Sequence, residues 1–531
     1  MRPFGMKALS VLTMSVVIMA VFNCESKPET DQWGNMKFRF EEYTIGQLQD
    51  GYRSGAFTVE EVVSEYLGRI EAIDANGPGL NSVIAVNPDA LAIARKQDQH
   101  LNQGGEMFPL FGIPVLLKDN IDTHDRMPTT AGSRAMKDSY PLQDSWVTAK
   151  LRDAGAVILG KTNLSEWANF RGELSSSGWS GVGGQTNNPY DIDRNPCGSS
   201  SGSGVAVAAN LCVIAIGTET NGSIVCPSTA NGIVGIKPTV GLISRSGIIP
   251  ISYSQDTAGP MARTVRDAVI SLGTMIGQDP ADNKTLASEG NVYADYSKFL
   301  NPDGLKGKRL GYFAKPLGEN FKVKAVMEEA VMFLKDNGVE IIELEQVFDP
   351  AAHLASFNVM LFEYKDGLNK YFASLGENAA IKNLDELIAF NEQDEIEMEF
   401  YNQAYLIQAN DKEDLESAEY LEALEKMHRL TREEGIDKVM DEHKLDAIIA
   451  PTGSPAWLTD HTNGDAFILS SSSAAAISGY PNITVPMGYV EGLPVGMSIF
   501  GRAWSEPVLI EIAYAYEKGT QHRRIPSFAA K

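Results

Sequence analysis

The sequence predicts an α/β protein in which helices cover both faces of a β-sheet. Short apolar runs separated by glycine-rich turns extend from about residue 83 to residue 277, and helical stretches lie between them. Strand–helix alternation of this kind is typical of a sheet that is buried on both faces. The chain has 531 residues, of which 43% are hydrophobic, so it can bury a large core. We expect one large domain over residues 38–531 rather than several independent domains.

The elements follow in order from their apolar periodicity. A capping box formed by Thr58 and Glu61 precedes apolar residues at helical spacing, which predicts an amphipathic helix up to residue 73. Further helices are expected over 145–154, 204–211, 323–337 and 506–518, and buried strands over 113–117, 156–159, 213–216, 233–236, 310–313, 445–451 and 483–486.

The segment at about 380–445 is acidic, poor in glycine and helical in period. We expect a helical insertion there, with a lid or an interaction surface as the alternative to a plain solvent-facing helix. Charge runs are usually solvated, and this is the expectation for Glu386, Glu392, Glu395, Glu397 and Glu399.

The N-terminus has the features of a targeting segment. A short basic region is followed by an apolar run from Ala8 to Phe22, which is shorter than the about 20 residues needed to span a bilayer. The run ends at Cys24 in a pattern that resembles a bacterial lipobox. We therefore interpret residues 1–23 as a lipoprotein signal peptide and residues 24–37 as a polar tether. A cleaved signal peptide with an incidental cysteine is the alternative.

Charge and cysteine content restrict the partners. The net charge of −24 argues against nucleic acid, because a phosphate backbone requires a basic face. Besides Cys24 the chain has Cys197, Cys212 and Cys226, whose spacing is not that of a zinc site. Three buried free thiols are expected, and a bridge between Cys197 and Cys226 is the alternative.

One lysine and two serines lie in an arrangement that favours nucleophilic catalysis. Lys118 ends an apolar run, while Ser199 and Ser223 lie in glycine-rich turns. A serine hydroxyl needs a base within hydrogen-bond reach, and none of the seven histidines lies in a comparable turn. A lysine can serve as that base if burial lowers its pKa. The neighbouring Asp119 would oppose this, but adjacent residues of a strand point to opposite faces.

These segments resemble the amidase signature family of serine hydrolases, and the resemblance extends over most of the chain. It implies that Lys118 is the base, that Ser199 bridges after a cis peptide bond, and that Ser223 is the nucleophile that becomes acylated. Val225 stands where many relatives carry arginine. The resemblance also implies an oxyanion hole of backbone N–H groups, from Thr220, Asn221, Gly222 and Ser223. Asn221 replaces a glycine of most relatives.

The same resemblance implies a large mixed β-sheet and the hydrolysis of a carboxamide to acid and ammonia without a cofactor or metal. The motifs are most similar to the peptide amidase branch, so C-terminal peptide amides or other small amides are the expected substrates. A fatty-acid-amide or aryl-amide hydrolase is the alternative. The lipobox implies a lipoprotein of the bacterial cell envelope, periplasmic or anchored at the outer membrane, or otherwise a secreted protein. Contact with the membrane is expected only through the lipid anchor, and the oligomeric state is open.

Three other readings compete with this one. Gly155–Thr162 matches the phosphate-loop pattern, but its apolar strand lies inside the pattern instead of before it; a strand ending at Gly160 is expected there. Ser200 is the centre of a nucleophile-elbow pattern that lacks the preceding strand. A non-catalytic solute-binding lipoprotein would also fit the N-terminus, but it has no use for the lysine and two serines.

Overall fold

The computed structural model describes residue 1, residues 38–377 and residues 379–528. The predicted signal peptide from residue 2 onward, the tether and Cys24 lie outside the described residues. Contacts group Arg39–Lys531 into one compact unit, which contains all the elements of the fold. Among the described residues, no helix combines the length and the apolar character needed to cross a bilayer.

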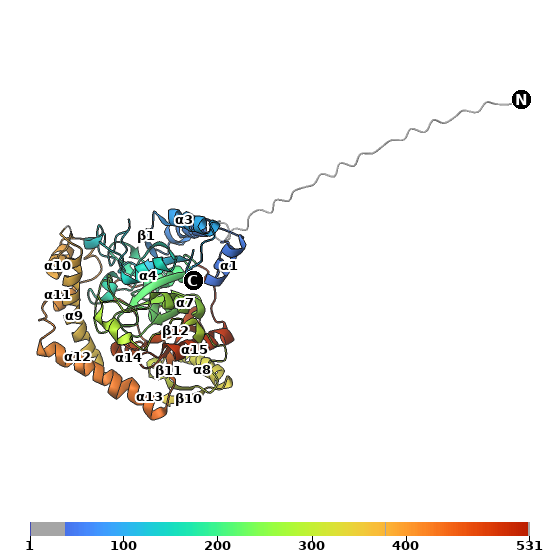
Figure 1. Ribbon diagram of the computed structural model, residues 1–531. Helices are drawn as coiled ribbons and strands as arrows, with labels where there is room; N and C mark the ends of the chain where they lie inside the picture. The colour runs from blue at the N-terminus through green and yellow to red at the C-terminus, as the bar shows by residue number, and fades with distance from the viewer. Residues whose placement is uncertain (2–37, 378, 529–531) are drawn as a thin grey trace. The chain divides into compact units, whose positions relative to one another are not determined.

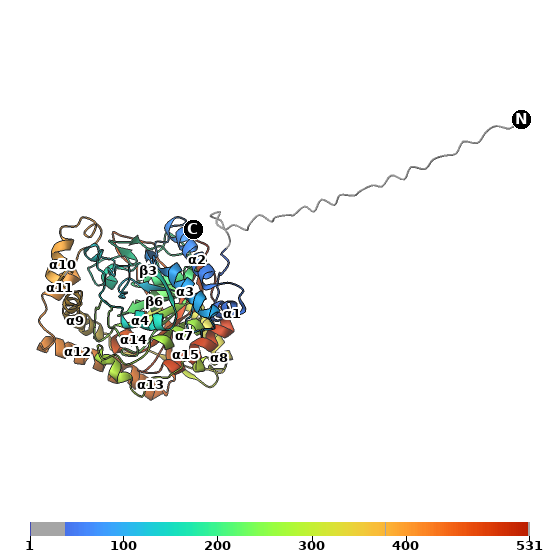
Figure 2. The same ribbon diagram turned by 45° about the horizontal axis from the view of Figure 1, so that its top comes forward.

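One mixed sheet of eleven strands organises the described residues, and it confirms the predicted fold class (Figures 1 and 2). The strand order is β1-β3-β2-β6-β8-β7-β12-β13-β11-β9-β10. The bounds are β1 Val83–Val86, β2 Pro114–Lys118, β3 Val157–Thr162, β6 Ile214–Glu219, β7 Val234–Lys237, β8 Thr257–Ala262, β9 Arg309–Phe313, β10 Glu340–Leu344, β11 Ala447–Pro451, β12 Asn482–Val490 and β13 Leu493–Phe500. Trp179–Ser180 (β4) and Gly184–Gln185 (β5) pair separately.

Helices cover both faces of this sheet. α5 and α6 pack against each other and on the central strands, whereas α7 packs with α4 and α15. In both views α9, α10, α11 and α12 gather at one side of the molecule (Figures 1 and 2). The bounds are α1 Ile45–Ser54, α2 Val59–Arg69, α3 Ala90–Asn102, α4 Trp146–Asp153, α5 Ser201–Ala208, α6 Val225–Ala230, α7 Val265–Met275, α8 Phe321–Asp336, α9 Ala352–Ser374, α10 Leu384–Asn391, α11 Ala404–Asn410, α12 Ala418–Thr431, α13 Asp437–His443, α14 Ser473–Ser478 and α15 Glu506–Thr520.

The predicted capping box is present at the start of α2. The Thr58 hydroxyl accepts from the N–H of Glu61 at 3.1 Å, and the Glu61 carboxylate accepts from the N–H of Thr58 at 2.9 Å. The predicted helix continues beyond α2 as a wider helical turn over Ile70–Ala75. This agreement follows from the local nature of capping, which depends only on residues three apart.

The parallel strands β2 and β6 bring distant sequence motifs to one edge of the sheet. They are direct neighbours, with Leu117 opposite Ile216. Because parallel strands end at the same edge, Lys118 at the end of β2 lies near Glu219 at the end of β6. The carboxyl edge of parallel strands is where α/β proteins form their sites.

The phosphate-loop reading and the expected end of its strand are both wrong. β3 continues through Gly160 to Thr162, so the glycine and lysine of the pattern are inside the strand. Lys161 is fully buried, and its Nζ donates to the carbonyl of Ile121 and to the hydroxyl of Thr129, both at 2.8 Å. These acceptors compensate the amine, which explains how a lysine can continue a buried strand.

The expectation of a solvated acidic face is wrong at Glu397. Its side chain is fully buried, and Oε2 lies 3.3 Å from Nη1 of Arg171. Oε1 accepts from the N–H of Arg134 at 2.6 Å. Glu166 shares the same guanidinium at 3.0 Å, and burial followed by the neighbouring Glu397 raises the pKa of Glu166 well above its ordinary value. The pattern of charges around Glu397 could not predict its pairing with Arg171, which lies more than 220 residues away in the chain.

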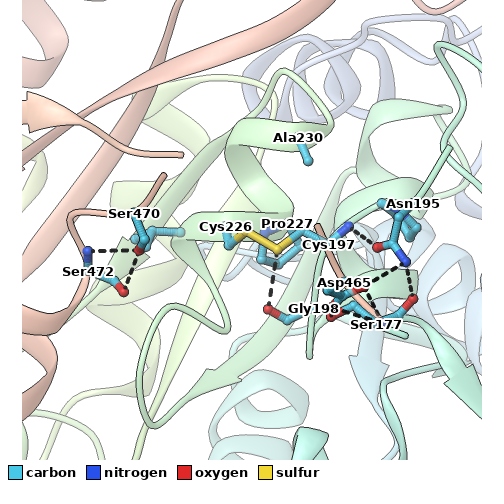
Figure 3. The surroundings of a disulfide bond; sticks show 12 residues. Ser177, Asn195, Cys197, Gly198, Cys226, Pro227, Ala230, Asp465, Ser470 and Ser472 are labelled. Atoms are coloured by element: carbon cyan, nitrogen blue, oxygen red, sulfur yellow. Dashed lines mark hydrogen bonds between the residues drawn. A yellow bond between two sulfur atoms is a disulfide. The ribbon is translucent and has the colours of Figure 1, made fainter. Parts of the chain in front are cut away.

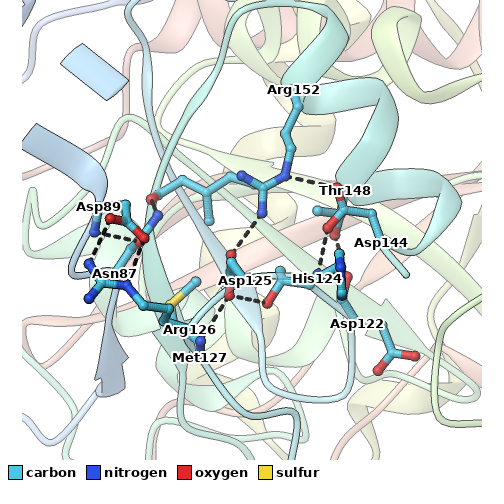
Figure 4. Close-up of polar contacts among 12 residues, drawn as sticks. Asn87, Asp89, Asp122, His124, Asp125, Arg126, Met127, Asp144, Thr148 and Arg152 are labelled. Carbon is cyan, nitrogen blue, oxygen red and sulfur yellow. Dashed lines mark hydrogen bonds and ion pairs between the residues drawn. The ribbon is translucent and has the colours of Figure 1, made fainter. Parts of the chain in front are cut away.

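The loop that follows β2 is held by ion pairs (Figure 4). Arg152 of α4 bridges two acids, with 2.7 Å to Asp125 and 3.0 Å to Asp144. Arg126, which follows Asp125 in the chain, pairs with Asp89. In addition, the Thr148 hydroxyl donates to a backbone carbonyl of this loop at 2.7 Å. Ion pairs to α4 and to Asp89 therefore hold the loop that follows β2 in place.

Candidate active site

Lys118 lies at the centre of the candidate site and is completely buried. Its Nζ is 2.7 Å from the hydroxyl oxygen of Ser199 and 2.9 Å from that of Thr218, and it is 3.2 Å from the Thr218 carbonyl oxygen. Burial lowers the pKa of Lys118 to about 7, while the negative charges of Asp256 and Glu219 act in the opposite direction. A large fraction of the amine is thus neutral near pH 7.

Asp119 does not oppose this neutral state, as expected from its place in the chain. Its carboxylate accepts from the N–H of Thr130 at 3.1 Å and from the Thr130 hydroxyl, and it lies 3.7 Å from Nζ of Lys161. Burial raises the pKa of Asp119 to about 6. Asp119 therefore does not stabilise the charged form of Lys118, because the two side chains contact different residues.

Ser199 follows a cis peptide bond with Gly198, as the family resemblance implied. The side chain is fully buried, and its hydroxyl contacts the Lys118 amine. Its carbonyl accepts from the N–H of Ser165 at 3.1 Å. A Cβ on Gly198 would lie 2.2 Å from the Ser165 hydroxyl, so this turn requires glycine.

Ser223 lies at the end of a turn whose backbone is hydrogen-bonded to the turn that contains Ser199. The side chain is half-buried, and its carbonyl accepts from the N–H of Ser200 at 3.1 Å. Within the described part of the chain, the Ser223 hydroxyl has no hydrogen bond. The structure therefore brings Lys118 to Ser199 and the backbone of Ser223 beside the Ser199 turn, without a hydroxyl contact between the two serines. Such contacts often tighten only with substrate.

The backbone N–H groups of this turn point to no protein acceptor. None of the N–H groups of residues 220–223 donates a hydrogen bond to another described residue. Gly222 has a φ of +86°, a conformation that side-chain-bearing residues rarely adopt. Glu219 holds the following segment, since its Oε2 accepts from the N–H groups of Ile224 at 2.8 Å and Val225 at 3.0 Å.

Residues far along the chain complete the site. The Thr220 hydroxyl donates to Asp256 at 2.6 Å. Asn221 is exposed, and its side-chain oxygen accepts from the Ser472 hydroxyl at 2.7 Å, while its amide donates to Ser473 at 3.3 Å. Sequence patterns did not identify Asp256, Ser472 or Ser473. These residues contact the turn of residues 220–223 only because the fold brings distant segments of the chain together.

Ser200, the alternative nucleophile, is fully buried and makes two hydrogen bonds with the backbone of Thr218. Its hydroxyl donates to the carbonyl at 3.1 Å and accepts from the N–H at 3.2 Å. Both its donor and an acceptor position are used structurally. This arrangement does not favour the nucleophile-elbow reading.

A cavity of about 890 Å³ adjoins the candidate site through Thr218, which accepts a hydrogen bond from Lys118. Its lining includes Asn120, Thr218 and Thr220, and also Arg245, Tyr253 and Lys284. The Asn120 amide donates to the Thr218 hydroxyl at 3.0 Å, whereas its buried carbonyl oxygen has no hydrogen-bond partner among the described residues. This volume is in the range of small-molecule sites.

The expectation of three free thiols is wrong. Cys197 and Cys226 form a disulfide between the two serine turns, with their Cα atoms 5.9 Å apart (Figure 3). Among the described cysteines, Cys212 is free and buried. The sequence left the bridge open because the two cysteines are 29 positions apart and the geometry of a disulfide depends on the fold.

Comparisons with known proteins identify the family of the chain. The family model described as Amidase matches residues 61–510, so the chain belongs to the amidase family. It is similar to a probable amidase of Arabidopsis thaliana, with 41% identity over 503 residues and 93% coverage of each chain. A glutamyl-tRNA(Gln) amidotransferase subunit of Microcystis aeruginosa is 35% identical, with 91% of this chain and 99% of the relative covered.

Solved structures give the same assignment. The native peptide amidase of Stenotrophomonas maltophilia is 48% identical with a TM-score of 0.89, and the match covers 93% of this chain and all of that one. The peptide amidase PAM with the competitive inhibitor chymostatin is also 48% identical, with a TM-score of 0.90 and coverage of 92% and 100%. The protein is an amide-hydrolysing enzyme, which excludes the solute-binding reading.

Proposed function

We propose that the protein hydrolyses C-terminal peptide amides and related small carboxamides through a serine acyl-enzyme. The single observation that carries this proposal is the 2.7 Å contact between the buried Lys118 amine and the Ser199 hydroxyl. The similarity to peptide amidases over nearly the whole chain supports the substrate class. The half-buried Ser223 supplies a hydroxyl that no described residue occupies.

The neutral amine of Lys118 has two N–H donors and one lone pair. The hydroxyl and carbonyl oxygens of Thr218 accept the two N–H groups, which leaves the lone pair for the Ser199 proton. Ser199 can then take the proton of Ser223. A base whose pKa lies near the working pH is effective in both directions of proton transfer.

Acylation then proceeds with a complete proton balance. Ser223 Oγ forms a bond to the carbonyl carbon of the amide, and its proton passes through Ser199 to Lys118. The unpaired N–H groups of residues 220–223 stabilise the oxyanion. As the carbon–nitrogen bond breaks, the proton returns through the same residues to the leaving nitrogen, and ammonia departs.

Deacylation repeats the relay with water. The water oxygen attacks the ester carbon, and its proton moves through Ser199 to Lys118. When the ester bond breaks, this proton returns to Ser223 Oγ and the acid product leaves. The acid and ammonia together contain the atoms of the amide and one water, and the enzyme is unchanged.

Ammonia release from a panel of amides tests this function. The panel contains short C-terminal peptide amides, free Asn and Gln, an aryl amide and a long-chain fatty amide. We expect release from the peptide amides, lost at least 10³-fold in Ser223→Ala because the nucleophile is removed. Ser271→Ala is the matched control, since this buried hydroxyl on α7 has no hydrogen-bond partner among the described residues.

Covalent labelling separates the possible failures. An acyl-directed serine probe should label Ser223 and should still label it in Ser200→Ala. Release from the aryl or fatty amide alone would replace the substrate class but keep the chemistry. Labelling of Ser200 instead of Ser223 would contradict the proposed nucleophile.

We also propose that the chain is exported and carries a lipid on Cys24. The disulfide between Cys197 and Cys226 supports this proposal, because such bonds persist mainly outside the cytosol. The lipobox-like pattern supports the choice of Cys24. Metabolic labelling with a fatty acid should mark the full-length protein and not the Cys24→Ala variant. Equal labelling of both would contradict the assignment.

A further inference from the structure

The disulfide joins the turn that contains Ser199 to the turn that contains Ser223. Figure 3 shows the bond and the residues around it. Cys197 lies two residues before Ser199, and Cys226 lies three residues after Ser223. The bond thus crosses between the two turns rather than closing a peripheral loop. Both sulfur-bearing side chains are buried, with 4% and 5% of their surface exposed.

Cys197 has a backbone conformation that needs external support. Its φ is +59°, in the left-handed region that disfavours residues with a Cβ. Its N–H donates to the Asn195 side chain at 2.8 Å, and its carbonyl accepts from the Ser201 hydroxyl at 2.6 Å. Such conformations persist where the surroundings determine them several times over. The bond to Cys226 adds a covalent constraint to these two hydrogen bonds.

On the other side, Cys226 is directly coupled to the oxyanion turn. It lies in the first turn of α6, and its N–H donates to the Gly222 carbonyl at 2.8 Å. Gly222 precedes Ser223 in the chain. A shift of the Cys226 backbone would therefore move the residue whose left-handed geometry shapes the turn.

A network of contacts surrounds the disulfide. Trp457 and Ala230 pack with the two cysteines. Asp465 accepts from the Trp457 indole at 3.1 Å and from the Asn195 amide at 3.3 Å. Asn195 in turn fixes the N–H of Cys197. The bond is thus one part of a chain of contacts that ends at the Ser199 turn.

We propose that the Cys197–Cys226 disulfide is a positioning element of the amidase chemistry. It sets the separation between the Ser199 turn and the Ser223 turn, which the proton relay must cross and which no hydroxyl contact spans in this structure. This inference rests on the proposed function of the two serines. The cysteines do not touch the reacting atoms. They act through the backbone of Gly198 on one side and Gly222 on the other.

Removal of the bond should affect turnover more than substrate binding. In the double variant Cys197→Ala/Cys226→Ala, we expect kcat for a peptide amide to fall at least tenfold while KM changes less than threefold. The rate at which an acyl-directed probe labels Ser223 should fall in parallel. The acid limb of the pH profile should stay near pH 7, because the Lys118 environment is retained. Cys212→Ala is the control for loss of a buried thiol outside the bridge.

The native protein provides a second measurement that does not depend on folding of the variant. Reduction with a phosphine converts the disulfide to two thiols and the phosphine to its oxide, and alkylation followed by mass analysis confirms the change. The reduced enzyme should show the same loss of kcat and faster hydrogen exchange at residues 195–204 and 220–230. Reoxidation with oxidised glutathione should return kcat and the hydrogen-exchange rates to the values of the untreated enzyme.

The outcomes separate this inference from the proposed function. Unchanged kcat in the reduced or variant enzyme, with a lower unfolding temperature alone, would make the bond purely structural and overturn the inference. If the oxidised wild-type enzyme cleaves no amide, the proposed function fails. The labelling rate and hydrogen exchange of the two turns then decide on the positioning role. Unchanged exchange in both turns after confirmed loss of the bond would also overturn it.

Discussion

Replacement of Lys118 by methionine should abolish activity and at the same time change how stability depends on pH. Methionine has a similar length and fits an apolar environment, but it has no amine to receive the Ser199 proton. Loss of the general base lowers the rate of amide hydrolysis by about 10³-fold. In the wild type, kcat/KM should rise about tenfold per pH unit below pH 7 and level off above it, because only neutral Lys118 is active.

The stability effect can be worked out from the same group. The pKa of Lys118 falls from the ordinary lysine value of 10.5 to about 7 in the folded protein, because the amine is buried. A difference of about 3.5 in pKa corresponds to about 5 kcal/mol. Between these two values the unfolded chain binds more protons than the folded one, so the free energy of unfolding rises with pH. The protonated amine therefore lowers the free energy of unfolding by about 5 kcal/mol below pH 7, and this unfavourable contribution disappears as the pH rises to 10.5.

Urea unfolding at pH 7.5, 8.5 and 9.5 measures this contribution. Between the first and last pH, the wild type should gain about 2.5 kcal/mol relative to Lys118→Met, because the variant lacks the titrating group. Lys237→Met is the matched control. Lys237 is also fully buried and has its pKa lowered to about 8 by burial, but it contacts the carbonyls of Pro238 and Tyr480. It should show a similar pH effect and retain activity.

Three results would refute this reasoning. A stability difference between wild type and Lys118→Met that is independent of pH would mean that the amine does not titrate in the folded protein near pH 7. Ammonia release retained in Lys118→Met would mean that another group accepts the proton. Loss of activity in both lysine variants would indicate a general effect of removing a buried amine rather than a role of Lys118.

Further predictions concern stability, measured by the free energy of unfolding in urea. Removal of the Cys197–Cys226 bond, which closes a separation of 29 residues, should cost about 4 kcal/mol; a change below about 1 kcal/mol would contradict this. Gly202→Ala should cost about 3 kcal/mol or more, because its Cβ would lie 2.3 Å from a backbone carbonyl oxygen. A variant as stable as the wild type would show that the close approach is relieved. Glu42→Ala should cost about 3 kcal/mol, since it leaves the largely buried Arg523 without its carboxylate at 2.7 Å. The double variant with Arg523→Ala should not be additive.

The parts of the fold that depend on local sequence could be predicted. The capping box of α2 involves residues three apart, and the apolar runs of β2 and β6 are continuous, so both are visible in the sequence. The end of β3 could not be predicted, because Lys161 is accommodated by two acceptors from a different loop. The buried position of Glu397 depends on Arg171, which is far more remote in the chain.

The candidate site divides in the same way. Lys118, Ser199 and Ser223 stand out because their glycine-rich or apolar surroundings are adjacent in sequence. Ser472 and Asp256 reach the site only through pairing of later strands and bear no recognisable motif. The disulfide falls between these cases, since its cysteines flank the motifs but their pairing required the geometry of the fold.

The contact of Asn221 with Ser472 and Ser473 has a consequence for the order in which the enzyme becomes active. The lysine and both serines are synthesised within the first 223 residues, but the residues that hold the Asn221 side chain follow about 250 positions later. The strands β12 and β13 come later still, and β12 pairs directly with β7 near the centre of the sheet. A growing chain therefore carries the reactive groups long before it can assemble their surroundings. Hydrolytic activity should appear only once the whole polypeptide has been released and folded, wherever in the cell that occurs.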